Sequence, residues 1–230
     1  MYKKYGGWSM NFGVIVAVAI GYLLGSLNSS LIVGRFYGVD IRHHGSGNAG
    51  MTNTMRTLGK KAALFVILGD VAKGVLAYLA GYLICGGDHQ GAFGGMLAGT
   101  AAILGHIWPV FFGFKGGKGV LTTLAVVLMI DWPIALGMLS VFIVVLLLTR
   151  YVSLGSIIAA FLLPITAIVF GRDVGAIIVF GIIAVLLIIM HHANIGRLLR
   201  GTESRFSFKK RADISTNAED DGMTDAKKAE

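Results

Sequence analysis

The stretch GFKGGKG, residues 113–119, places four glycines and two lysines between two strongly apolar segments. It follows GHIWPVFF at residues 105–112 and precedes VLTTLA at residues 120–125. Because glycine lacks a Cβ atom, several backbone N–H groups can turn toward one anion without a clash. Lys115 and Lys118 add positive charge, and the following helix would add the positive end of its dipole. The stretch therefore predicts a phosphate-binding loop between two apolar helices.

The composition of the 230-residue chain indicates a membrane protein. Hydrophobic residues make up 55% of it and charged residues 14%, whereas soluble domains carry about 25% charged residues. The single cysteine, Cys85, excludes an internal disulfide and a cysteine-based metal site. The net charge of +8 suits anionic lipid headgroups or phosphorylated substrates. Since the basic residues stand in short loops between apolar runs, we expect no nucleic-acid partner, and we expect no metal or other cofactor.

Seven apolar segments follow one another along the chain. They are Phe12–Val33, Ala62–Ile84, Ala92–Phe112, Val120–Ile130, Trp132–Thr149, Leu154–Phe170 and Val174–Met190. The fourth has eleven residues, about 16 Å of helix, which is too short for about 30 Å of hydrocarbon. It must be buried among neighbours, thin the bilayer or belong to a re-entrant element, so a topology with fewer full spans stays open. The expected fold class is an all-α polytopic membrane protein with about seven transmembrane helices and a short fourth one.

The charges in the loops predict the orientation of the chain in the membrane. Basic residues gather in alternate loops and at the C-terminal end, whereas the other loops carry acidic residues such as Asp88 and Asp131. Basic loops remain in the cytoplasm, which puts the N-terminus outside and the C-terminus inside. Residues 1–206 then form a single integral-membrane domain in the cell membrane. Residues 207–230 turn polar and charged, and we expect them to form a disordered cytoplasmic tail.

Four polar clusters fall at the cytoplasmic ends of the segments under this topology. The first, residues 40–56, is punctuated by glycines, so tight turns can bring hydrogen-bond donors and arginines to a phosphate. The second is the glycine loop, the third begins the sixth segment, and the fourth follows the seventh. The candidate catalytic and phosphate-binding residues in these clusters are Arg42, Ser46, Asn48, Asn53, Arg56, Lys115, Gly116, Gly117, Lys118, Gly119, Ser153, Ser156, His191 and Asn194.

Simpler interpretations of the clusters stay open. The arginines of residues 40–56 can serve topology alone, and the glycine loop can be a flexible basic turn. A Walker-type loop is excluded, because Gly119 stands where a Ser or Thr magnesium ligand belongs. Ser153 and Ser156 can simply cap a helix, and His191 can be an interfacial histidine.

Three polar residues stand within or beside the apolar segments. Asp70 and Lys73 lie one helical turn apart in the second segment, either as a structural ion pair that faces the bundle or as part of a substrate site. His106 precedes a tryptophan and a proline, and we expect it to anchor the helix at the membrane interface.

The polar clusters resemble the motifs of the PlsY family, the bacterial integral-membrane acyl-phosphate:glycerol-3-phosphate acyltransferases. The resemblance covers nearly all of residues 12–206, and three separate motifs occur in the family's order. The matching stretches are Asp40-Ile41-Arg42 with Gly45-Ser46-Gly47-Asn48, Thr52-Asn53 and Arg56, then Gly105-His106 through Pro109 to Phe114-Lys115-Gly116-Gly117-Lys118-Gly119-Val120, and lastly His191, Asn194-Ile195, Arg197-Leu198 and Glu203. Further matches are Asp70 with Lys73-Gly74, and Arg150-Tyr151-Val152-Ser153-Leu154.

The resemblance implies a reaction and roles for residues. A fatty acyl group would move from acyl phosphate to the 1-hydroxyl of sn-glycerol 3-phosphate, giving lysophosphatidic acid and phosphate, the first step of phospholipid synthesis. The expected partners are these two substrates and membrane lipids, and the soluble enzyme that makes acyl phosphate is a further candidate. The family's essential serine maps to Ser46 and its arginine to Arg56, with Arg42 as second choice. Its glycerol-3-phosphate loop maps to residues 116–119, its histidine and asparagine to His191 and Asn194, and its structural glutamate to Glu203.

The sequence also departs from the family pattern. After Gly25-Ser26 the family commonly has a proline, whereas this chain has Asn28 followed by two serines, and Met51 replaces a usual alanine. These changes lie in or near the first motif and bear on contact with the acyl donor. Two other classes of function compete with the enzyme: a transporter for a phosphorylated solute, which should show repeat symmetry and charged residues at mid-membrane, and a non-catalytic scaffold.

Overall fold

The structure is a computed structural model that describes residues 12–206, and all regular secondary structure in that range is helical. The helices are α1 (Phe12–Ser26), α2 (Ser29–Phe36), α3 (Met51–Thr57), α4 (Lys60–Ile84), α5 (Asp88–Ile107), α6 (Val120–Ile130), α7 (Trp132–Thr149), α8 (Val152–Val169), α9 (Val174–Met190) and α10 (His192–Leu199). Short 3-10 turns lie at Ile41–His43 and Val110–Phe112. The tail predicted at residues 207–230 lies outside the described residues.

The predicted class, a polytopic helical membrane protein, is confirmed. Five segments are long and apolar enough to cross a membrane, namely Phe12–Phe36, Lys60–Ile84, Asp88–Phe112, Trp132–Thr149 and Val152–Val169. Helices α9 and α10 are bent by 57° at a break and make a sixth as one span. Together with the shorter α6, these are the seven apolar segments of the sequence.

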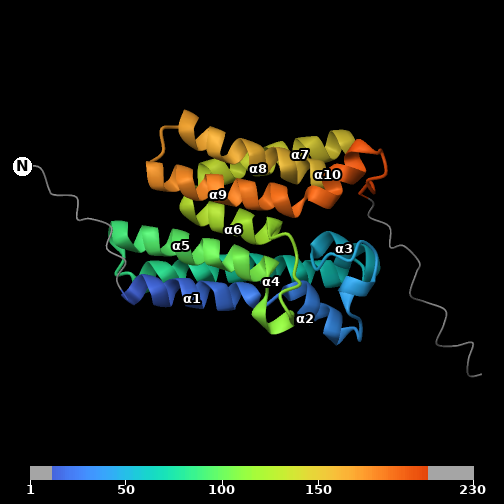
Figure 1. The fold of residues 1–230 in the computed structure, drawn as a ribbon, viewed down its shortest axis with the longest axis horizontal. Helices are drawn as coiled ribbons and strands as arrows, with labels where there is room; N and C mark the ends of the chain where they lie inside the picture. Colours follow the sequence, from blue (N-terminus) through green and yellow to red (C-terminus); the bar gives the residue numbers. More distant parts are fainter. Residues whose placement is uncertain (1–11, 207–230) are drawn as a thin grey trace, which may run out of the picture.

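The helices form two layers with α6 between them (Figure 1). Helices α1, α4 and α5 pack together in one layer, and α7, α8 and α9 form the other. Helix α6 contacts α4 and α5 on one side and α7 and α9 on the other. The short fourth segment is therefore buried among its neighbours, which was one of the three arrangements that its length allowed.

The first layer is held by small residues that let the helices approach closely. A Cβ atom added at Gly21 or Gly25 of α1 would overlap the backbone of Ala98 or Ala102 of α5. In a bilayer, where lipid tails are as apolar as leucine, such close backbone packing is what favours helix association. The glycines of α1 thus fix where α5 lies, and α5 leads directly into the glycine loop.

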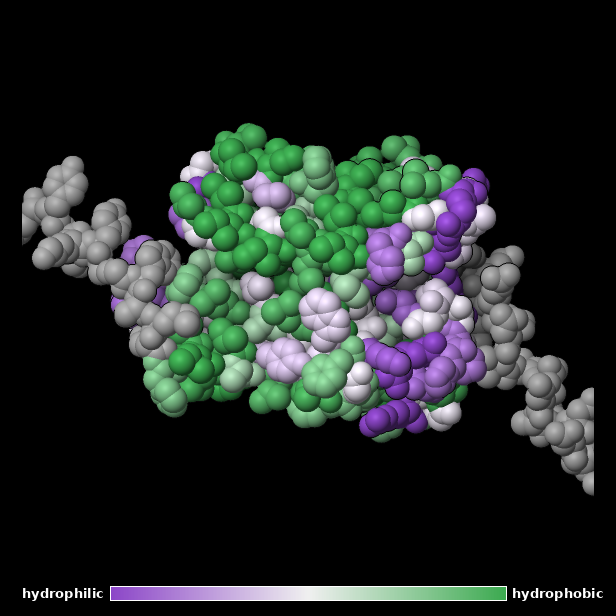
Figure 2. Space-filling model, viewed as in Figure 1, coloured by the Kyte–Doolittle hydropathy of each residue, from purple (hydrophilic) through white to green (hydrophobic). Residues whose placement is uncertain are grey.

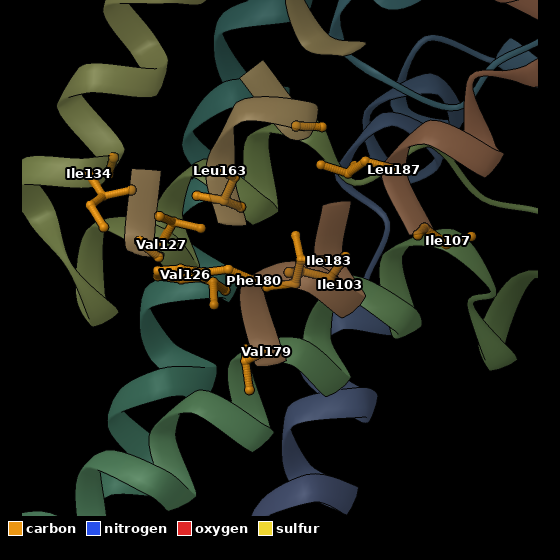
Figure 3. Close-up of a cluster of buried hydrophobic side chains, with 13 residues drawn as sticks. Ile103, Ile107, Val126, Val127, Ile134, Leu163, Val179, Phe180, Ile183 and Leu187 are labelled. Carbon is orange, nitrogen blue, oxygen red and sulfur yellow. The ribbon is translucent and has the colours of Figure 1, made fainter. Parts of the chain in front are cut away.

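The second layer is joined to α5 and α6 by the main apolar core (Figure 3). This core runs from Ile103 on α5 through Val126 on α6 to Phe180 and Ile183 on α9, all fully buried. Large apolar side chains such as Leu148 point outward instead, as expected of a surface that faces lipid.

Hydrophilic residues gather at one end of the molecule (Figure 2). It is the end at which Figure 1 shows α3, α10 and the loop between α5 and α6. The first predicted segment breaks at this end, because Asn28 starts a new helix: its Oδ1 accepts a hydrogen bond from the Leu31 N–H at 3.1 Å. The chain continues from α2 into the polar residues 40–56.

Candidate active site

A cavity of about 780 Å³ opens at the polar end and continues between the helices of the second layer and α6. Its polar part is lined by Ser46, Asn48, Asn53, Arg56, Asp70, His106, Lys118, Gly119, Ser153, Ser156, His191, Asn194, Arg197, Glu203 and Ser204, among others. Its apolar part includes Leu121, Leu124, Val127, Met138, Leu139, Phe142, Leu163 and Leu187. One continuous space thus offers charged groups at one end and hydrocarbon at the other.

Asn53 shapes the loop that carries Ser46. Its Oδ1 accepts from the Ser46 N–H at 2.8 Å, and its Nδ2 donates to the carbonyls of Ile41 at 3.1 Å and His44 at 2.9 Å. Gly45 passes this side chain with φ +60°, and a Cβ there would overlap the Asn53 amide. The amide of Asn53 is therefore occupied by the backbone, and its role here is to hold the loop in place.

The amides of Gly116 and Gly117 in the glycine loop are already used. The N–H groups of Gly116 and Gly117 donate to the carbonyls of Ile107 and His106, at 3.1 and 3.2 Å. These bonds fold the loop back onto the end of α5, so neither glycine lines the cavity. Only Lys118 and Gly119, just before α6, reach it, so a phosphate would meet a lysine ammonium rather than the Gly116 and Gly117 amides.

The two candidate arginines have different positions relative to the cavity. Arg42 pairs with Asp40 at 2.7 Å and donates to the carbonyls of Phe112 at 3.0 Å and Lys115 at 3.4 Å. It braces the glycine loop from outside and, like Lys115, does not line the cavity, whereas Arg56 does. The guanidinium beside Asp40 also holds the pKa of that carboxyl at about 2, well below its usual value.

The third and fourth clusters meet at Glu203. Its carboxylate accepts hydrogen bonds from Ser153 Oγ at 2.7 Å, Asn194 Nδ2 at 2.6 Å and Arg197 Nε at 2.7 Å. Asn194 Oδ1 in turn accepts from the ammonium of Lys118. Glu203 thereby joins α8, α10 and the glycine loop into one network, and Ser153 is occupied in it.

Burial sets the electrostatics of this network. The pKa of Lys118 falls to about 8, mainly because of burial; the cations Arg197 and Arg56 also lower it, whereas Glu203 raises it. Burial also opposes ionisation of Glu203, but its three hydrogen-bond donors outweigh that effect and hold its pKa below the usual value. Near neutral pH the site therefore combines an ionised carboxylate with a weakly held lysine proton.

His191 and Ser156 line the cavity. The Nδ1 hydrogen of His191 and the hydroxyl hydrogen of Ser156 are already in hydrogen bonds within their own helices. His191 Nδ1 lies 2.8 Å from the Leu187 carbonyl, and because a carbonyl only accepts, Nδ1 carries the proton. The neutral ring then leaves Nε2 as a hydrogen-bond acceptor. Ser156 Oγ donates to the Val152 carbonyl at 2.9 Å, one turn back in its own helix.

The expectation that His106 anchors the membrane interface is wrong. Its side chain is buried, with 3% of the residue exposed, and its Nδ1 lies 2.8 Å from Lys73 Nζ. Lys73 is paired with Asp70 at 2.9 Å and donates to the Leu27 carbonyl at 3.2 Å. Asp70 and His106 reach the cavity wall, so this buried cluster of α4 and α5 borders the site.

Some lining residues had no recognisable signal in the sequence. The apolar wall cannot be distinguished among so many leucines and valines. Ser204, which accepts from Arg56 at 3.1 Å, lies in a stretch without periodicity. Arg197 was named only as part of a motif match, and its helical spacing of three residues from Asn194 could have placed it beside the site.

These features define a polytopic membrane protein whose cationic, polar pocket opens into an apolar cavity, a form suited to a phosphate head with a lipid tail. The family model described as Glycerol-3-phosphate acyltransferase matches residues 15–201. The chain belongs to this family, as the three motifs predict. Curated relatives named glycerol-3-phosphate acyltransferase include one from Clostridioides difficile, 45% identical with 86% of this chain and 98% of the relative covered. Another, from Trichlorobacter lovleyi, is 42% identical, with 82% and 95% covered.

Two solved structures have the same fold. They are crystal structures of PlsY (YgiH), an integral membrane glycerol 3-phosphate acyltransferase, in its glycerol 3-phosphate and lysophosphatidic acid forms. The first matches with a TM-score of 0.78 and 39% identity, covering 84% of this chain and 96% of the other. The second matches with a TM-score of 0.76 and 38% identity, covering 85% and 96%.

Proposed function

We propose that this protein transfers a fatty acyl group from acyl phosphate to the 1-hydroxyl of sn-glycerol 3-phosphate. The products are lysophosphatidic acid and inorganic phosphate, and the site faces the cytoplasm, where a soluble enzyme supplies the acyl phosphate. The reaction is the first step of phospholipid synthesis. The membership of the glycerol-3-phosphate acyltransferase family supports the acceptor, and the resemblance of the motifs to those of acyl-phosphate-dependent enzymes supports the donor.

One observation carries this proposal: a single cavity joins the basic pocket to the apolar space. Glycerol 3-phosphate and acyl phosphate each carry a phosphate, and the polar end presents Arg56 from α3 and Lys118 from the loop before α6. Arginine and lysine both form strong charge-assisted hydrogen bonds to phosphate. The acyl tail can lie among the apolar side chains of α6, α7 and α8, which keeps it out of water while its reactive head stays at the polar end.

The reaction requires alignment of the two substrates more than activation of the acyl donor. Acyl phosphate is a mixed anhydride, so its carbonyl is already electrophilic and phosphate leaves readily. The 1-hydroxyl oxygen forms a bond to the carbonyl carbon, and the bond from that carbon to the phosphate oxygen then breaks. Holding the two phosphates beside each other converts this into a reaction of adjacent groups. Arg56 and Lys118 supply that alignment, with Ser46 and Asn48 as further polar contacts at the mouth of the cavity.

Two groups can take the proton of the attacking hydroxyl. One is Nε2 of His191, which is an acceptor because Nδ1 is bound to the Leu187 carbonyl. The other is the phosphate of the substrate itself. A covalent acyl-serine is not part of the proposal, since Ser153 donates to Glu203 and Ser156 to the Val152 carbonyl, and neither bond joins a serine to a histidine base.

The decisive experiment supplies purified protein with glycerol 3-phosphate and either acyl phosphate or acyl-CoA. We expect equal amounts of inorganic phosphate and lysophosphatidic acid with acyl phosphate, and no acylated product with acyl-CoA. Acylation from acyl-CoA alone would overturn the donor but keep the acceptor. Release of phosphate without lysophosphatidic acid would show a hydrolase instead.

A further inference from the structure

The last turn of α5 contacts the glycine loop through both the backbone and the ring of His106. The His106 carbonyl accepts a hydrogen bond from the Gly117 N–H at 3.2 Å. The ring lies against the same glycine, because a Cβ added at Gly117 would overlap His106 Nε2 and the Ala49 carbonyl oxygen. Glycine allows this close approach, since it has no Cβ. The loop therefore lies directly on the Nε2 edge of the ring.

The opposite edge of the ring is held by Lys73. The Lys73 ammonium lies 2.8 Å from His106 Nδ1, is paired with Asp70 at 2.9 Å and donates to the Leu27 carbonyl at 3.2 Å. An ammonium can only donate, so Nδ1 accepts and the ring hydrogen is on Nε2. Lys73 and His106 are both buried, and a buried ammonium hydrogen without an acceptor costs free energy. The hydrogen bond from Lys73 therefore fixes the tautomer and orientation of the ring.

The position of Gly117 determines where Lys118 enters the cavity. Gly117 is buried between α5 and the loop of residues 40–56, and Lys118 is the next residue along the chain. Consecutive Cα atoms lie about 3.8 Å apart, so the two residues move together. The Lys118 ammonium meets the side-chain oxygen of Asn194 at the cavity. A shift of Gly117 away from the ring would therefore move the lysine relative to α10.

We propose that His106 is a positioning residue: its ring, oriented by Lys73, holds Gly117 so that the Lys118 ammonium meets the phosphate of glycerol 3-phosphate. This inference rests on the proposed function. His106 acts through the loop, and the proposal gives it neither a bond to the substrate nor a proton to transfer. Positioning of this kind has large effects, because a misplacement of about 1 Å by a distant change can cost about 100-fold in rate.

The substitution His106→Asn tests this role. Asparagine keeps a side-chain acceptor for Lys73 but removes the ring edge from beside Gly117. We expect the KM for glycerol 3-phosphate to rise by about 10-fold, with a smaller change in kcat. Gly81→Ala is the control, because a Cβ there would overlap the Gly94 carbonyl in the contact between α4 and α5, away from the loop. It should lower stability and leave the KM at the wild-type value.

The pH dependence separates positioning from a general loss of stability. Lys118 faces the charged groups Arg56, Arg197 and Glu203 and the ring of His191, and its burial holds its pKa at about 8. A displaced loop leaves the lysine less buried, so its pKa should rise toward the ordinary value of 10.5. Since kcat/KM falls when the lysine loses its proton, the alkaline limb should move to higher pH in the asparagine variant. It should stay near pH 8 in the control.

A second variant and a binding measurement complete the test. If His106→Asn does not fold, Asp70→Asn with Lys73→Met removes the donor to Nδ1 without leaving one buried charge unpaired, and it should change KM and the limb in the same direction. A KM within about threefold of the wild type, or an unmoved limb, would refute the positioning role, as would equal changes in Gly81→Ala. Equilibrium binding of glycerol 3-phosphate without an acyl donor gives the same comparison without turnover. A wild type that binds glycerol 3-phosphate but makes no lysophosphatidic acid refutes the proposed function, while the role of His106 is still measured by Kd.

Discussion

At the scale of single residues, the prediction with the largest expected effect on activity concerns Lys118. It is the lysine of the glycine loop that reaches the cavity, and it is partnered there by the side-chain oxygen of Asn194. A charge-assisted hydrogen bond contributes about 1.5–3 kcal/mol, and about 1.4 kcal/mol is a factor of ten. We therefore expect Lys118→Ala to raise the KM for glycerol 3-phosphate by roughly 10- to 100-fold. Steady-state kinetics measure this directly, and an unchanged KM would remove Lys118 from the binding site.

The same lysine predicts a pH dependence. Its pKa of about 8 in the free protein means that it is charged below pH 8 and neutral above. Since the charged form binds phosphate, kcat/KM for glycerol 3-phosphate should fall as the pH rises through about 8. Bound phosphate favours the ammonium, so the alkaline limb of kcat should lie at higher pH. Lys118→Arg is the control, because arginine stays charged: its kcat/KM should show no fall near pH 8, and an identical limb would assign the titration to another group.

Asn28 joins the first motif to the membrane-spanning helices. It is fully buried at the break between α1 and α2, caps α2, and its Nδ2 lies 3.4 Å from the carbonyls of both Ala49 and His106. It thereby ties the loop of the first motif to the end of α5. Asn28→Ala should cost about 1–3 kcal/mol of stability. Asn28→Ser, which keeps the cap but lacks the amide, should fall between Ala and the wild type in thermal unfolding in detergent; equal stability of Ser and wild type would show that the amide contributes nothing.

At the scale of elements, the helices were predictable and their polar connections were not. The bounds of α6, α7 and α9 agree with the apolar runs of the sequence, because hydrophobic length alone defines them. The same holds for the shortness of α6. The break at Asn28 was not predicted. Asparagine is a common helix N-cap, but this one stands inside an apolar run from Phe12 to Val33, and its contacts with residues 49 and 106 are long-range.

The candidate site was also predictable only in part: its motif residues could be identified in the sequence, but their hydrogen-bond partners could not. Motif residues such as Ser46, Arg56, Lys118, His191 and Asn194 do meet at one cavity. Which of the loop's amides are free, and which arginine faces inward, depends on long-range hydrogen bonds to backbone carbonyls, and these leave no local pattern in a sequence.

The contact between α4 and α5 contains an ion pair whose loss should be costly. Asp70 and Lys73 have side chains only 2% and 5% exposed. Removing one partner of a buried pair costs about 3–5 kcal/mol, since it leaves the other charge unpaired. We expect Asp70→Asn to be strongly destabilising, and Asp70→Asn with Lys73→Met to be less so than the sum of the single changes.

A second pair in the same chain serves as the control for this double-mutant cycle. Asp131 and Arg172 lie 2.6 Å apart, but the arginine side chain is 37% exposed. Asp131→Asn should lower the free energy of unfolding by about 0.2–1 kcal/mol, because the asparagine can still cap α7. Unfolding of all variants in one detergent gives the comparison. Additive effects of the Asp70 and Lys73 changes would show that the two charges do not interact.

At the scale of the whole molecule, the arrangement of polar and apolar surfaces predicts how the protein sits in the membrane. The glycine loop, α3 and α10 gather at one end, and the turn between α4 and α5 lies at the other (Figure 1). Most of the polar site residues lie at that first end, and Asp70, within α4, is the exception. This distribution favours an enzyme at the membrane surface over a transporter with a central site. The basic loops predict that this end lies in the cytoplasm.

Cysteine labelling tests this orientation. In a Cys85→Ala background, which removes the single native cysteine, cysteines are introduced at His43 and Lys115 near the site and at His89 at the far end, all exposed. A membrane-impermeant maleimide should label the first two only in inside-out vesicles and His89→Cys only in right-side-out vesicles. Because α4 and α5 run between these ends, the two groups must lie on opposite sides if the helices span. Labelling of all three from one side would contradict the spans, and the reverse pattern would move the site away from the cytoplasm, where acyl phosphate is supplied in our proposal.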